Sequence, residues 1–262
     1  MIRVGTSGWA YKAWQPLFYP EKLPQKRYLE HYSSRLNTVE VNYSFRRFIP
    51  ESTLTNWIAS TPADFLFCVK ANQVLTHIKR LKNAQDSLAR FCDSIQPLAS
   101  AGKLGCVLFQ LPPNFKADAA VLDAFLADVP RAVRSSWEFR HASWFADNVY
   151  NVLRKHNAAL CLAESDDLDV PDVHTASFDY YRLRKSDYTP EQLHAIAARL
   201  HAAQTQAAQT TPSRQPAASN AQNPSETADR EIFAFMKHEE RPESALNAEQ
   251  VLKLAQQQAP AA

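Results

Sequence analysis

The chain has 262 residues, 45% of them hydrophobic and 21% charged, and 29 Lys+Arg against 27 Asp+Glu give a formal net charge of +2. This balance is typical of a globular protein and does not by itself indicate a nucleic-acid partner. The chain holds only 4 glycines, and their spacing excludes the G-x-G-x-x-G and G-x-x-x-x-G-K-[ST] phosphate loops, so no nucleotide cofactor is expected.

Short apolar, β-branched or aromatic runs recur along the chain and predict strands. We expect eight of them, at residues 2–7, 38–43, 65–70, 106–111, 136–140, 159–164, 178–183 and 231–238. Helix-like segments alternate with these runs, at residues 25–36, 50–60, 84–101, 118–128, 147–156, 190–203 and 247–257. The sixth connection is the weakest, because residues 169–175 are too few for more than about one turn.

This alternation favours a parallel sheet, because parallel neighbours need crossover connections that are usually helical. Eight repeats predict a single-domain TIM-type (β/α)8 barrel over residues 1–255. An open doubly wound sheet remains the alternative, since a count of strands does not prove closure. Residues 201–230 are Ala, Gln, Thr, Ser, Pro and Asn without large apolar groups, which predicts a disordered insertion before the last strand. Residues 256–262 are expected to fray.

The cysteines and the start of the chain bear on the compartment. The four cysteines form no C-x-x-C or zinc-type pair, so we expect reduced and mostly buried thiols. Residues 1–5 lack a charged region followed by a long apolar stretch, and no apolar run reaches about 18 residues. These patterns predict a cytoplasmic protein without a membrane partner.

Polar side chains gather at the carboxyl ends of the expected strands, where a TIM-type barrel builds its site. The candidates are Ser7, Trp9, Glu40, Asn42, Lys70, Gln110, Glu138, Arg140, Glu164, Arg182, Lys237 and His238. Residues two apart on a strand share a face, so Glu40 with Asn42, and Glu138 with Arg140, are expected to point into the barrel mouth. Ion pairs that merely cap the barrel are the structural alternative.

The mixture of charges predicts a site for a small anion that carries phosphate or carboxylate. Lys70, Arg140 and Arg182 would hold the anion, because Lys and Arg pair well with such groups. Glu138 or Glu40, with Lys70, would provide general acid or base chemistry, and Asn42 and Gln110 would orient the substrate. Further binding candidates are Ser7, Trp9, His77, Glu164 and Lys237.

A divalent metal is an open alternative at the same mouth. There is no H-E-x-x-H and no close histidine pair, and a lone histidine is more often structural or solvated than a ligand. If one metal binds, the first ligands to test are Glu40, Glu138, Glu164 and His238.

The loop after the third strand contains His77, Lys79, Arg80 and Lys82, which could grip phosphate alone or in a nucleic-acid backbone. A solvated helix start explains the same pattern. Aromatic residues follow several strand ends and could stack on a ring or base, although packing under loops is at least as common. They are Trp9, Tyr11, Trp14, Tyr43, Phe45 and Trp144.

The ordered motifs of this chain resemble those of the YecE-like proteins, also called domain of unknown function 72. The resemblance rests on residues 4–9, 18–20, 37–45, 67–72, 76–77, 108–113, 137–141, 143–145, 235–239 and 245–248. It implies a TIM-type barrel and supplies no reaction, although such barrels are similar in fold to endonuclease IV-type and sugar-isomerase-type enzymes. The chain departs from the family pattern at Glu164, where Asp is more usual, and at Arg184-Lys185, which replace His-Gly.

Three functions are therefore open. The first is an enzyme, with or without one metal, that acts on a small anion. The second is a nucleic-acid-binding or endonuclease IV-like barrel, whose binding would weaken steeply with salt. The third is a sensor that binds a small anion without turnover. The sequence does not predict the oligomeric state.

Overall fold

The computed structural model describes residues 1–185, 187–205, 230–237 and 241–257. Within them the strands are β1 (Ile2–Thr6), β2 (Thr38–Val41), β3 (Leu66–Lys70), β4 (Leu104–Gln110), β5 (Ser135–Glu138), β6 (Ala159–Ala163), β7 (Phe178–Leu183) and β8 (Glu231–Met236). The α-helices are α1 (Tyr28–Ser33), α2 (Glu51–Ala59), α3 (Gln85–Ser100), α4 (Ala119–Asp128), α5 (Asp147–Lys155), α6 (Pro190–Thr205) and α7 (Glu243–Gln257). Residues 164–177, the weak sixth connection, contain no helix or strand.

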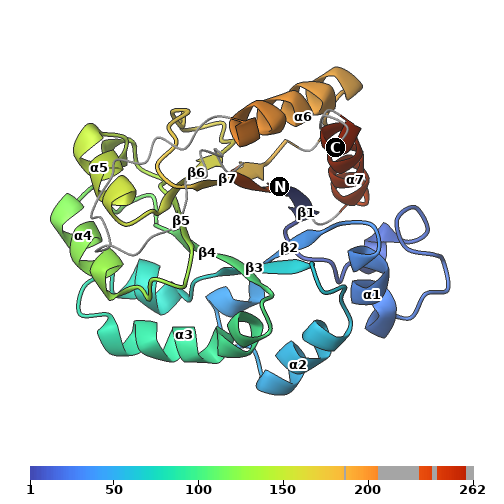
Figure 1. Cartoon of the computed structure of the whole chain (residues 1–262), viewed down its shortest axis with the longest axis horizontal. Helices are drawn as coiled ribbons and strands as arrows, with labels where there is room; N and C mark the ends of the chain where they lie inside the picture. The colour runs from blue at the N-terminus through green and yellow to red at the C-terminus, as the bar shows by residue number, and fades with distance from the viewer. Residues whose placement is uncertain (186, 206–229, 238–240, 258–262) are drawn as a thin grey trace, which may run out of the picture.

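The eight strands run parallel in the order β1-β8-β7-β6-β5-β4-β3-β2. The two end strands of this order meet at a bridge between Ser7 and Glu40, which nearly closes the sheet on itself. Figure 1 shows the strands in the middle of the molecule with the helices around them, and the first strand beside the C-terminal helix α7. The molecule is the TIM-type (β/α)8 barrel that the alternation predicted, and not an open sheet.

Side chains hold β1 against β2 where a full ladder is missing. The Tyr32 hydroxyl accepts the Thr6 backbone N–H at 2.8 Å and donates to the Thr38 carbonyl at 2.9 Å. Asn37 closes the other end of this seam, because its Oδ1 accepts the Val4 N–H at 2.9 Å. The seam is thus closed by polar side chains, the buried Tyr32 and the partly buried Asn37, which satisfy the strand edges.

The interior of the barrel is apolar along most of its length and polar at the carboxyl ends of the strands. Its apolar residues alternate along the strands, for example Cys106 and Leu108 on β4, and Phe178 and Tyr180 on β7. The next residue of the same parity is polar, Gln110 on β4 and Arg182 on β7. The period of two therefore carries polar side chains to the carboxyl ends of the strands, as in other barrels of this type. Three of the four cysteines are buried and free, and Cys92 is partly buried.

Two boundaries differ from the expectation. Helix α6 continues to Thr205, so residues 201–205 are helical and do not begin the polar insertion, and Arg230 is buried. The remainder of that insertion, 206–229, lies outside the described residues, as does the end of the expected tail, 258–262. Gln256 and Gln257 belong to α7. Among the described helices, none is long and apolar enough to cross a membrane.

The seam between β1 and β2 makes a prediction about Gly5. A Cβ added there would lie 2.0 Å from the Thr38 carbonyl oxygen, which belongs to the backbone of β2. We expect Gly5→Ala to lower the free energy of unfolding by about 3 kcal/mol or more in urea denaturation. Gly102→Ala is the control, because that site is open but has φ +68°, and should cost about 1–2 kcal/mol. Equal losses in the two variants would contradict the tight closure of this seam.

Candidate functional site

A polar layer covers the apolar interior at the carboxyl ends of the strands. Seven strands each contribute one side chain to it, either from the strand itself or from the residue that follows the strand. Its members are Ser7, Glu40, Lys70, Gln110, Glu138, Arg182 and Lys237. All seven were predicted as site residues, and the structure brings them together because they are the inward-facing positions next above the apolar core.

Arg182 lies at the centre of this layer. Its side chain has no solvent exposure, and its guanidinium bridges two carboxylates that are equally buried. Nη2 donates to Glu40 Oε1 at 2.8 Å, and Nη1 donates to Glu138 Oε2. The two carboxylates come from β2 and β5, so the arginine of β7 links distant parts of the barrel. A charge at this depth is tolerated only with such partners.

The other oxygen lone pairs of the two carboxylates are also occupied. Glu40 accepts hydrogen bonds from Ser7 Oγ at 2.6 Å, Asn42 Nδ2 at 3.1 Å and the Tyr180 hydroxyl at 2.8 Å. Glu138 accepts from Gln110 Nε2 at 2.8 Å, Arg140 Nε at 3.1 Å and Arg184 Nη2 at 2.5 Å. Both carboxylates are therefore held firmly in place by hydrogen bonds to their charged form.

These contacts decide the protonation of the pair. Burial raises the pKa of Glu40, but Arg182, Lys237 and the hydrogen bonds outweigh burial and lower it to about 2. Burial likewise opposes the charge of Glu138, and Arg182, Arg184 and Arg140 hold its pKa far below the usual range. Both groups stay ionised near neutral pH, which makes them poor proton donors there.

Lys70 titrates close to neutral pH. Its ammonium donates to Gln110 Oε1 at 2.9 Å and lies 4.3 Å from the centre of the Phe45 ring. Burial and the nearby Arg182 charge lower the pKa of Lys70 to about 8, against the attraction of Glu40 and Glu138. A lysine of this kind can give and take a proton under physiological conditions.

His77 lies next to Lys70 on the same rim. Its ring packs edge-on against Phe45, with the centroids 5.0 Å apart, and its Nδ1 is 2.9 Å from the Thr76 hydroxyl. Burial and the charges of Lys70, Arg140 and Arg80 lower the pKa of His77. The imidazole is neutral near pH 7, so it contributes a hydrogen-bonding group there and no charge.

A cavity of about 360 Å³ opens above Lys70. Among the residues that the structure describes, its charged lining side chains are all basic: Lys70, Lys237, Arg46 and Arg47. Its other lining residues are Asn42, Tyr43 and Phe45. We call this space the basic cavity. Because its lining carries only positive charge, it favours an anion.

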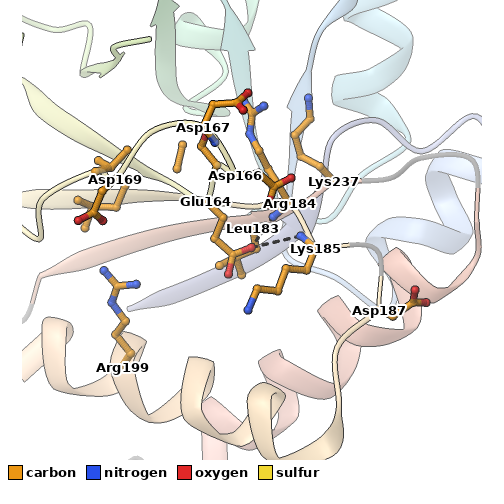
Figure 2. A pocket seen from close by; sticks show the side chains of 14 residues that line it. Glu164, Asp166, Asp167, Asp169, Leu183, Arg184, Lys185, Asp187, Arg199 and Lys237 are labelled. Carbon is orange, nitrogen blue, oxygen red and sulfur yellow. Dashed lines mark hydrogen bonds between the residues drawn. The ribbon is translucent and has the colours of Figure 1, made fainter. Parts of the chain in front are cut away.

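A wider depression of about 1020 Å³ lies between the ends of β6 and β7, and Figure 2 shows its lining. Acidic and basic side chains alternate there, and they include Glu164, Asp166, Asp167, Asp169, Arg184, Lys185 and Arg199. This mixed lining does not select one sign of charge. Glu164 points to the backbone of the loop after β7, where its Oε2 accepts the Arg184 N–H at 2.6 Å (Figure 2).

Trp9 does not line the basic cavity. Together with Ser7 and Asn42 it lines a separate pocket of about 430 Å³, whose walls are mostly apolar. Two of the other aromatic candidates are packing residues, since Trp14 and Trp144 have no solvent exposure. Tyr43 is 49% exposed and stands at the rim.

The donor set does not fit a divalent metal among the described residues. No three His, Cys, Asp or Glu side chains gather in that part of the chain. Glu40 and Glu138 face the guanidinium of Arg182, which occupies the position of a cation, and Glu164 faces backbone N–H groups. The fourth suggested ligand, His238, lies outside the described residues.

Some residues of the site were not predicted. Tyr180 and Arg184 share the parity of Arg182 on and after β7, so the same period of two could have found them. Arg46 and Arg47 follow a short 3-10 helix, Tyr43–Phe45, after β2. The spacing of Arg46 and Arg47 in the sequence does not predict a place in the site, because tertiary packing sets the turn that brings them over the mouth.

The Arg182 bridge makes a prediction about stability. Arg182→Met leaves two buried carboxylates without their shared partner, so we expect the free energy of unfolding at pH 7 to fall by about 3–5 kcal/mol. The low pKa of Glu40 stabilises the native protein above its unfolded pKa of about 4.3, and this contribution is lost as the pH falls toward 2. In the variant the carboxylates take up protons more readily, so the difference should shrink between pH 7 and pH 4. Urea denaturation across this range measures it.

The matched control is the triple variant Glu40→Gln/Glu138→Gln/Arg182→Met, which removes all three charges. It should recover much of the stability that the single variant loses at pH 7, because no uncompensated charge stays buried. A loss below about 1 kcal/mol in Arg182→Met would contradict the central role of the bridge.

Comparison with known proteins places this barrel among relatives. The UPF0759 protein YunF of Bacillus subtilis (strain 168) is 34% identical over 160 residues, which cover 57% of this chain and 54% of the relative. The UPF0759 protein YecE of Escherichia coli (strain K12) is 28% identical over 147 residues, covering 56% of this chain and 51% of the relative. The chain thus spans about half the length of the curated relatives it matches.

Two solved structures share the fold over nearly the whole chain. The DUF72 family protein TM1631 of Thermotoga maritima has a TM-score of 0.80 at 22% identity and covers 98% of this chain and 99% of its own. The DUF72 family protein EF0366 of Enterococcus faecalis has a TM-score of 0.73 at 16% identity, with 98% and 96% coverage. The family model described as protein of unknown function DUF72 matches residues 3–262, and the chain belongs to this family, as the motifs of the YecE-like proteins predicted.

Proposed function

We propose that the protein is an enzyme that binds a small phosphate- or carboxylate-bearing substrate in the basic cavity. The observation that supports the proposal is the lining of this cavity, in which the charged side chains among the described residues are Lys70, Lys237, Arg46 and Arg47. An anion held there gains charge-assisted hydrogen bonds from several directions. The mixed depression beside Glu164 offers no such preference.

In this proposal Lys70 carries the proton transfer, and the two carboxylates support it. Glu40 and Glu138 were the first candidates for general acid or base, but their low pKa values and full sets of hydrogen bonds suit them to orienting other groups. Lys70, with a pKa of about 8, passes between its charged and neutral forms near neutral pH. Gln110 accepts its hydrogen bond and fixes its position.

The titration of Lys70 favours an enzyme over a sensor. A residue that only binds an anion is most effective when it is always charged, as arginine is. A lysine partly neutral at physiological pH weakens binding but provides a base. Recovery of a bound ligand unchanged under all conditions would favour the sensor.

A nucleic-acid partner has less support from the geometry. The basic stretch after β3 was the reason to consider one, but Lys79 donates to the Asn83 carbonyl at 2.5 Å, and Arg80 to Asn114 at 3.2 Å. Those contacts direct two of its basic groups to the protein's own loops. A small anion is therefore better supported as the substrate than a nucleic acid.

The pH dependence of anion binding tests the role of Lys70. Sulfate serves as the probe, since its charge is constant between pH 6 and pH 10. We expect sulfate affinity, measured by isothermal titration calorimetry, to fall as the pH rises through about 8, because Lys70 loses its proton. Lys70→Met should weaken sulfate binding about tenfold or more at pH 7 and flatten the profile around pH 8.

Two controls separate charge from titration. Lys70→Arg keeps the positive charge at all these pH values, so it should retain binding and lose the inflection near pH 8. Lys155→Met removes an exposed lysine at the end of α5, away from the mouth, and should behave like the unsubstituted protein. Sulfate binding that is equal in Lys70→Met and the unsubstituted protein would refute the assignment.

A further inference from the structure

The pocket of about 430 Å³ beside the mouth has mostly apolar walls, to which Trp9, Tyr11, Tyr43 and Trp57 contribute aromatic rings. Trp9 meets Trp57 edge to face, with the ring centroids 4.9 Å apart at 83°. Trp57 in turn stacks on Phe67 of β3, with centroids 5.6 Å apart and an angle of 17°. Because its rings are held by the barrel itself, this aromatic pocket is formed before any ligand arrives, and its volume lies in the usual range of small-molecule sites.

The aromatic pocket adjoins the basic cavity. Asn42 and Tyr43 line both spaces, so the aromatic pocket and the basic cavity share a wall. Tyr43 is half exposed at this junction, and the Arg47 guanidinium lies 5.2 Å from the centre of its ring. A molecule that spans the junction would meet apolar rings at one end and positive charge at the other.

Asn42 lies at the junction of the two spaces. Its Nδ2 donates to Glu40 Oε1 at 3.1 Å, and the carboxylate fixes the amide in this orientation. Its Oδ1 is buried and has no hydrogen-bond partner in the part of the chain that the structure describes. The hydrogen bond to Glu40 therefore fixes Asn42 as a polar part of the wall between the aromatic pocket and the basic cavity.

We propose that the ligand of this site is a flat apolar ring joined by a short linker to an anionic group. The ring enters the aromatic pocket against Trp9 and Trp57, and the anion enters the basic cavity. The proposal rests on the proposed function, because it places the anion in the same cavity. A flat ring fits better than a branched aliphatic group, since faces and edges of aromatic rings pair favourably with another ring.

Phenyl phosphate, inorganic phosphate and cyclohexyl phosphate test the proposal by calorimetry at pH 7.5. We expect phenyl phosphate to bind at least about tenfold more tightly than inorganic phosphate, and more tightly than cyclohexyl phosphate, whose ring is at least as apolar but not flat. Phenylacetate and acetate form a parallel pair, and their difference shows whether the anionic group can also be a carboxylate.

A pair of variants on α2 tests where the ring lies. Thr53 lines the aromatic pocket, so Thr53→Trp should fill it and remove the advantage of phenyl phosphate while inorganic phosphate still binds. Thr55→Trp introduces the same side chain at an exposed position of the same helix and should change neither affinity.

The outcomes are distinguishable. If inorganic phosphate binds and phenyl phosphate binds no more tightly, the ring site is refuted and the proposed function stands. If Thr53→Trp and Thr55→Trp keep the same preference for phenyl phosphate, the ring does not occupy the aromatic pocket and the inference fails. If neither phosphate binds to the unsubstituted protein, the proposed function fails and this inference with it. The comparison of ligands decides the matter even if Thr53→Trp does not fold.

Discussion

The site depends on one buried interaction, the bridge from Arg182 to Glu40 and Glu138. The three groups have almost no solvent exposure, so each charge needs the other two. The bridge joins β7 to β2 and β5 across the mouth, and it fixes the positions of the side chains that hydrogen-bond to the same carboxylates. It also bears on the proton chemistry, because it keeps both carboxylates ionised, whereas the pKa of Lys70 lies near 8.

The polarity of the mouth follows from the same arrangement. The carboxylates of Glu40 and Glu138 accept hydrogen bonds from neighbouring side chains of the protein. Lys70, Arg46 and Arg47, by contrast, line the basic cavity. Positive charge along this lining favours an anionic ligand. The adjoining aromatic pocket extends this preference from charge to shape. In the proposed complex one end of the ligand is recognised by charge and the other by the rings of Trp9 and Trp57, with Asn42 in the wall that both spaces share.

The sequence predicted the barrel and its polar layer, because a period of two and the carboxyl ends of parallel strands are local properties that tertiary packing does not alter. Lys70, Gln110, Glu138 and Arg182 were found in this way. It did not predict that Arg182 would be buried between the carboxylates, since the same strand-end position suits a substrate contact equally well. Arg46 and Arg47 escaped prediction because a loop carries them to the mouth. The position of Glu164 at the end of a strand predicted that it would join the other site residues at the mouth. Its carboxylate instead accepts a hydrogen bond from the backbone of the loop after β7.

The most direct test of the account is a crystal structure of the protein with phenyl phosphate bound. The account predicts phosphate density among Lys70, Lys237, Arg46 and Arg47, with the phenyl ring against Trp9 and Trp57 and the Arg182 bridge unchanged. Phosphate density in the depression beside Glu164, or a phosphate that displaces Arg182 from Glu40 and Glu138, would contradict it.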